Sequence, residues 1–179
     1  MMSSQKQPTI KSKYNKGTIA IHWISAILIL ALFPLGKYMA GIPVIEKITL
    51  IRIHSAFGFL VFILTIIRSI LFFTSKRPEH LSTGSKVNDL LAIIVQRSFY
   101  FLLLAIGISG SAIMIYGGYA DALISSTALP ELILPKNEIA ALKVHNILAT
   151  IMLVLVAMHI VGVIRYNLLH KTNVIKRIA

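Results

Sequence analysis

Hydrophobic residues are gathered into four long runs that carry almost no charge, and shorter polar segments separate them. The runs cover residues 17–36, 53–73, 98–119 and 144–164, and Arg68 is the one charge that interrupts the second run. An α-helix needs about 20 such residues to cross a hydrocarbon layer of about 30 Å. The pattern therefore predicts an all-α protein, a four-helix transmembrane bundle.

Two alternatives to four membrane helices fit this pattern less well. Strands of a transmembrane barrel alternate apolar and polar residues over about 10 positions, whereas these runs are continuously apolar. The first run follows a basic segment, as the core of a secretory signal peptide does, but that core spans only about 7–15 residues. Because residues 17–36 contain no charge at all, we expect this run to remain as a membrane span.

Composition supports the membrane assignment and narrows the chemistry. Hydrophobic residues make up 56% of the chain, above the roughly 45–50% of a soluble domain. The sequence contains no cysteine. This excludes disulfides, iron–sulfur clusters held by thiolates, thiolate-ligated zinc and covalently attached c-type haem. A bound metal must therefore use His, Met, Tyr or carboxylate ligands.

Basic residues lie mainly on one side of the predicted membrane spans. Of 18 Lys and Arg, thirteen lie in the N-terminal tail, in or beside the connection between the second and third runs, or near the C-terminus. The other two connections carry a net charge of +1. Since basic loops stay in the cytoplasm, we expect both termini to be cytoplasmic. The net charge of +12 then reflects topology and contact with membrane lipid, and we expect no nucleic-acid partner.

The polar segments give the expected domain organisation. Residues 1–13 are expected to form a disordered cytoplasmic tail, and residues 14–179 a single four-helix transmembrane domain. Pro78 and Gly84 mark the connection after the second run as a linker. The longest connection, residues 117–138, has room for a short helix on the outer surface, and its role is not legible from the sequence.

Histidines inside the predicted spans indicate a functional site, because an imidazole in hydrocarbon needs a partner. His22 lies near the cytoplasmic end of the first run and His54 near the outer end of the second. The fourth run carries His145 near its outer end and His159 towards the inside. Between these two, an α-helix rises roughly 21 Å and returns to within about 40° of the same face. Depth therefore pairs His22 with His159 and His54 with His145.

Two imidazoles at one depth, on facing helices, suit the axial positions of a haem held inside a four-helix bundle. The pattern predicts two haem b groups whose iron ligands are the pairs His22/His159 and His54/His145. Two rival explanations stay open. The histidines could hydrogen-bond between helices, or they could line a proton or metal path in a haem-free transporter. Zinc would need three or four ligands at one depth, and only two are present.

Other residues fit the haem hypothesis less specifically. Basic side chains at both depths could neutralise haem propionates, although snorkelling to the headgroups explains them equally well: Arg52 and Lys143 in the outer half, and Arg68, Arg97 and Arg165 in the inner half. Small residues could allow close approach of a porphyrin or of another helix, namely Gly58, Gly107, Ser109, Gly110 and Ser111. His80 and His170 lie in cytoplasmic segments and are expected to be solvated.

The sequence resembles the bacterial cytochrome b561 family, four-helix dihaem cytochromes of the inner membrane. The resemblance rests on "AIHW" at residues 20–23, "RIHSAFG" at residues 52–58 with Arg68 after it, and the His145–His159 spacing. It implies that His22, His54, His145 and His159 ligate haem b, and it implies no separate catalytic residue. This sequence also departs from the family pattern at three places. Where relatives often carry a histidine early in the third span it has Gln96 and Arg97, and where they carry a histidine pair just beyond the last ligand it has Tyr166 and Asn167. Gly107 stands where relatives usually have a proline.

The resemblance also implies a function. Members pass single electrons between a periplasmic-side donor and ubiquinone, and one branch resembles a superoxide oxidase, which makes superoxide the first candidate donor. The alternative is a haem-carrying membrane anchor that conducts electrons for a partner protein, a dehydrogenase or hydrogenase. Either role places the chain in the bacterial inner membrane as a multi-pass protein.

Overall fold

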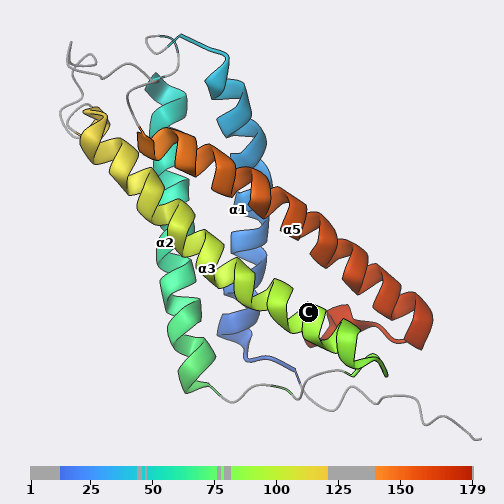
Figure 1. Cartoon of the computed structure of the whole chain (residues 1–179). Helices are drawn as coiled ribbons and strands as arrows, with labels where there is room; N and C mark the ends of the chain where they lie inside the picture. Colours follow the sequence, from blue (N-terminus) through green and yellow to red (C-terminus); the bar gives the residue numbers. More distant parts are fainter. Residues whose placement is uncertain are drawn as a thin grey trace, which may run out of the picture.

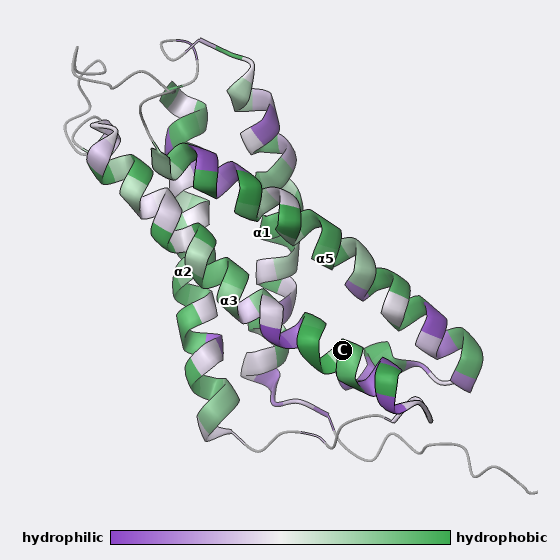
Figure 2. Cartoon of the chain, in the orientation of Figure 1, coloured by the Kyte–Doolittle hydropathy of each residue, from purple (hydrophilic) through white to green (hydrophobic). Residues whose placement is uncertain are grey.

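The computed structural model describes residues 13–43, 46, 48–75, 78, 82–120 and 140–178. This part contains four long helices and no strand: α1 (Lys16–Ala40), α2 (Ile48–Thr74), α3 (Lys86–Tyr116) and α5 (Ala140–His170) (Figure 1). Each of the four is long and apolar enough to cross a membrane, and hydrophobic residues predominate along them (Figure 2). The predicted all-α, four-helix transmembrane fold is therefore confirmed.

The third helix begins twelve residues before the predicted run, at Lys86 instead of residue 98. Ser85 caps it, since its side chain accepts a hydrogen bond from the backbone N–H of Asn88 at 3.5 Å. Asp89 lies in the first turn, where a negative charge is favourable, and accepts a 2.7 Å hydrogen bond from the N–H of Thr83. The prediction from the charge-free run omitted these first turns of the helix, because they mix polar and apolar residues.

Both described ends of the chain lie at the same end of the bundle, which we call the terminal end. The backbone N–H of Tyr14 donates to the carbonyl of Arg177 at 3.2 Å, and the indole N–H of Trp23 donates to the carbonyl of Ile178 at 2.6 Å. The second carbonyl follows a short 3₁₀ helix, η3 (Val174–Arg177). The sequence predicted no helix after the fourth run, and η3 was missed because four residues carry no periodic signal.

Helix packing leaves one side of the bundle open. α1 packs along α2, α2 against α3, and α3 along α5, whereas α1 and α5 make very few contacts among the described residues. The interior is loosely filled: no side chain in the described part is fully buried, and Val61, Leu102 and Met152 are among the few apolar side chains that come close. Large apolar side chains cover the outer faces instead, as contact with lipid requires.

Three expectations fall wholly or mainly on residues that lie outside the described ones. These are the disordered tail before Lys13, the solvated His80, and the helix within the connection 117–138 from residue 121 onward. His170 is described and is the last residue of α5. It is not simply solvated, because it is half-buried and its ring lies 4.3 Å from that of Tyr166 at an angle of 33°.

Candidate functional site

The structure brings His54 and His145 together at the end of the bundle opposite the termini, which we call the distal end. His54 lies in the second turn of α2 and His145 in the second turn of α5, and both side chains are half-buried. Their ring centroids are 6.3 Å apart, with the ring planes at 70°. A metal ion bonded to one nitrogen of each ring, at about 2 Å, needs centroids roughly 6 Å apart. The spacing therefore fits one metal ion held between the two rings.

Residues of α3 hold the ring of His145. Its Nδ1 lies 3.1 Å from the carbonyl oxygen of Ile106 and 3.0 Å from the hydroxyl of Ser109. The Ser109 hydroxyl itself donates to the same carbonyl at 2.9 Å. A carbonyl can only accept, so Nδ1 carries the ring proton when it bonds to Ile106 and Nε2 is left free to bind a metal. Metal-bound histidines commonly show this arrangement.

A glycine lies against each ring of the distal pair. A Cβ on Gly36 of α1 would lie 3.2 Å from Cε1 of His54, and a Cβ on Gly110 of α3 would lie 3.3 Å from Cε1 of His145. Either methyl group would crowd the imidazole. Gly110 was among the predicted small residues, whereas Gly36 was not; Gly58, which was, has nothing within 4 Å of its Cβ position.

The free nitrogen of His54 also fits an additional bound group. Its Nδ1 is buried and has no hydrogen-bond partner. A buried polar atom without a partner is costly, so native structures rarely keep one without a reason. A cofactor with polar groups in this region would give that nitrogen a partner. The distal pair thus offers the donor set, the spacing and the glycine cradle of a haem site.

Towards the terminal end, the structure brings together His22 of α1, His159 of α5 and Arg68 of α2. A guanidinium nitrogen of Arg68, Nη1, lies 3.2 Å from Nδ1 of His22. Arg68 also interacts electrostatically with His159, and the two histidines interact with each other. Aromatic rings flank the pair: Trp23 lies 5.3 Å from His22, and Phe99 lies 5.6 Å from His159. Trp23 was noted in the sequence as part of the AIHW motif, whereas Phe99 was not identified from the sequence.

The other predicted cationic partners are spread more widely. Arg97 and Arg165 are exposed on the outer faces of α3 and α5, which suits side chains that reach the headgroups. Arg52 lies two residues before His54 and has a buried Nε atom. Of the inner-half cations, Arg68 is the one that directly contacts a histidine of a pair.

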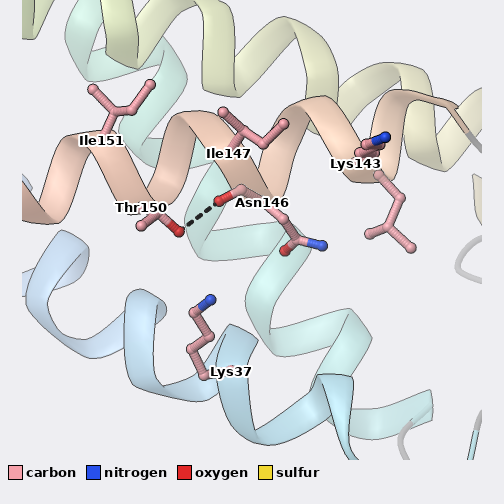
Figure 3. Close-up of a pocket in the computed structure, with 7 residues that line it drawn as sticks. Lys37, Lys143, Asn146, Ile147, Thr150 and Ile151 are labelled. Atoms are coloured by element: carbon pink, nitrogen blue, oxygen red, sulfur yellow. Dashed lines mark hydrogen bonds between the residues drawn. The ribbon is translucent and has the colours of Figure 1, made fainter.

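A groove of about 550 Å³ opens between α1 and α5 near the distal end. It is lined by Lys37, Leu142, Lys143, Asn146, Ile147, Thr150 and Ile151, and Figure 3 shows Lys37 extending from α1 towards α5. At 100° per residue, the six lining residues of α5 are centred roughly 150° around the helix from His145, so the groove lies on a different face of α5 from the histidine. The sequence did not predict it, since its two lysines come from helices far apart in the chain.

The described residues contain no cluster of three or more His, Asp or Glu side chains able to hold a metal ion. A closed zinc site with three or four protein ligands is therefore not formed in this part of the chain. Paired histidines are the metal-ligating feature that the fold presents.

A four-helix membrane bundle with paired histidines near both of its ends has the arrangement expected of a membrane-bound cytochrome. The sequence matches the family described as prokaryotic cytochrome b561 over residues 13–179. It is also 28% identical over 171 residues to Cytochrome b561 homolog 2 of Escherichia coli (strain K12), covering 92% of this chain and 90% of that protein. The chain belongs to the prokaryotic cytochrome b561 family. It is a multi-pass membrane protein of electron transfer, and its family binds haem b.

Proposed function

We propose that this chain is a dihaem b cytochrome that carries single electrons across the bacterial inner membrane, between a periplasmic-side donor and ubiquinone. The observation that carries the proposal is the distal pair, whose ring centroids lie 6.3 Å apart. In this proposal His54 and His145 hold one haem, and His22 and His159 hold the other. Bound haem supplies one-electron chemistry at its iron; the protein holds the ligands, orients them and excludes water.

The positions of the pairs on α5 support a path across the membrane. His145 and His159 belong to one continuous helix, along which they are separated by roughly 21 Å of rise. This is most of a hydrocarbon layer of about 30 Å. The excess of basic residues near the termini favours a cytoplasmic terminal end and a periplasmic distal end. Electrons from a periplasmic donor would then enter at the distal pair.

The groove supports an anionic donor, and superoxide is the first candidate. Lys37 and Lys143 line it at the same end of the bundle as the distal pair, although the two outer connections carry a net charge of only +1. Local positive charge raises the rate at which an anion arrives, and salt weakens this effect. Each superoxide gives up one electron and leaves as dioxygen. Two such electrons and two protons convert one ubiquinone to ubiquinol.

Purified protein in liposomes containing ubiquinone tests this function. We expect superoxide generated outside the vesicles to reduce the bound haem and to form ubiquinol, with two superoxide consumed per quinol. The double variant Lys37→Gln/Lys143→Gln should bind as much haem as the wild type but react with superoxide several-fold more slowly. Its rate should also fall less steeply as salt is added, because the steering charge is gone.

Two results would contradict the proposal in different ways. If the double variant kept the wild-type rate and salt dependence, the groove would not be the place where the donor approaches. If neither superoxide nor ubiquinol reduced the bound haem, the protein would have no independent activity of this kind. In that case, co-purification with a dehydrogenase or hydrogenase subunit would identify the chain as a haem-carrying anchor and electron conduit instead.

A further inference from the structure

We propose that Arg68 raises the reduction potential of the haem site formed by His22 and His159. Arg68 acts here as a positioning residue through its charge and is not itself a ligand. This inference rests on the proposed function, because it needs a haem at each pair.

Arg68 is placed to act on both histidines of the pair. It lies in the last third of α2, within the membrane-spanning helix, and is half-buried. Its Nη1 is 3.2 Å from Nδ1 of His22, and it interacts electrostatically with His159 as well. Its guanidinium carbon lies 5.6 Å from the centroid of the Tyr100 ring, a cation–π contact that holds the charge in place independently of His22.

Few carboxylates of the protein's own helices are available to neutralise this charge inside the membrane. The segments that form α1, α2 and α5 contain no Asp or Glu, and α3 contains only Asp89, in its first turn. A positive charge in a region of low dielectric acts more strongly on its neighbours than one exposed to water. Arg68 therefore supplies a lasting positive potential at the terminal pair.

The hydrogen bond between Arg68 and His22 must change when His22 becomes a ligand. A guanidinium can only donate, so Nδ1 of His22 is the acceptor and Nε2 carries the ring proton. An imidazole that binds a metal through Nε2 needs the opposite tautomer, with the proton on Nδ1. His22 then has no lone pair to offer Arg68. The guanidinium stays on α2 beside the pair and keeps its contact with the Tyr100 ring.

The distal pair has a different environment. Nδ1 of His145 faces the carbonyl oxygen of Ile106, at 3.1 Å, and a hydrogen bond to a carbonyl makes an imidazole a stronger electron donor to its metal. A stronger donor favours the oxidised state of the bound iron. A neighbouring guanidinium favours the reduced state, which carries one positive charge less. Cations also lie near the distal pair, namely Arg52, Lys37 and Lys143. Arg68 is therefore expected to raise the potential of the terminal site and not to fix the direction of transfer.

Redox titration of purified protein, followed by haem absorbance, tests this inference. In Arg68→Gln we expect one of the two midpoints to fall, so that the ratio of reduced to oxidised haem at a given ambient potential drops about tenfold, or 59 mV for one electron. Arg68→Lys should recover most of the shift. Arg165→Gln is the matched control, since it removes one exposed positive charge from α5 and should move neither midpoint appreciably. The shifted component should be the one that His159→Ala removes.

Three results would overturn the proposal: two unchanged midpoints in Arg68→Gln, an equal shift of both, or loss of one haem, which would make Arg68 a structural residue. The haem content of the wild type is measured first. A wild-type protein without haem would refute the proposed function itself, and this outcome is separate from any result of the titration.

Discussion

Replacing His145 by Ala should leave the protein with one haem, and replacing His159 by Ala should also leave one, but a different one. Each substitution removes a proposed axial ligand from one pair and leaves the other pair intact, because the two residues lie on α5 roughly 21 Å of helix rise apart. Haem per chain and the reduced-minus-oxidised spectrum measure the effect. The spectral component that is missing from the His145→Ala protein should be the component that remains in the His159→Ala protein.

The pairing itself is tested by the partner histidines. His54→Ala should give the same residual spectrum as His145→Ala, since their ring centroids lie 6.3 Å apart. His22→Ala should match His159→Ala. His170→Ala serves as the control on the same helix, because its ring contacts Tyr166 and neither pair, and this variant should keep both haems. If His145→Ala and His159→Ala bleached the same component, the assignment of pairs by depth would be wrong.

The second large effect concerns Gly107, where α3 lies against α2. A Cβ at this position would overlap the ring of Phe62, and extra volume in a well-packed contact typically costs about 1–3 kcal/mol. We therefore expect Gly107→Ala to lower the midpoint of thermal unfolding in detergent. The helices or the ring must shift to make room, and α3 also carries the Ile106 carbonyl and Ser109 that hold His145.

Two further variants make this prediction specific. Gly58→Ala is the matched control, since its Cβ would meet nothing within 4 Å, and it should leave the midpoint unchanged or raise it slightly. Shortening the neighbouring ring in Gly107→Ala/Phe62→Leu should recover part of the loss, as expected for coupled contacts. Equal midpoints for Gly107→Ala and Gly58→Ala would show that the Gly107–Phe62 contact does not limit stability.

The sequence was sufficient for the features that depend on one helix at a time. Continuous hydrophobicity predicted the four membrane helices, and the spacing of His145 and His159 along one helix predicted two sites at different depths. Features that depend on how two helices meet were not predictable in the same way. The Ile106 carbonyl that faces His145 is a backbone atom, and Gly36 becomes relevant only because α1 brings it against His54.

The contact made by Arg68 was likewise not predictable from one helix alone. The position of Arg68 in an apolar run was visible in the sequence, where a role with haem propionates and snorkelling to the headgroups explained it equally well. Its partner in the structure is the imidazole of His22, and this contact depends on the relative rotation of α1 and α2. The start of α3 was predicted too far along the chain for a local reason. The helix begins at the Ser85 cap, with Asp89 in its first turn, before the apolar run starts.

The haem content of the purified wild-type protein tests the central claim most directly. The pyridine haemochrome assay, set against protein concentration from amino-acid analysis, gives haem b per chain. Two histidine pairs, one near each end of the bundle, predict a value close to two. A value well below one would contradict the account, because the paired imidazoles would then have to serve another purpose.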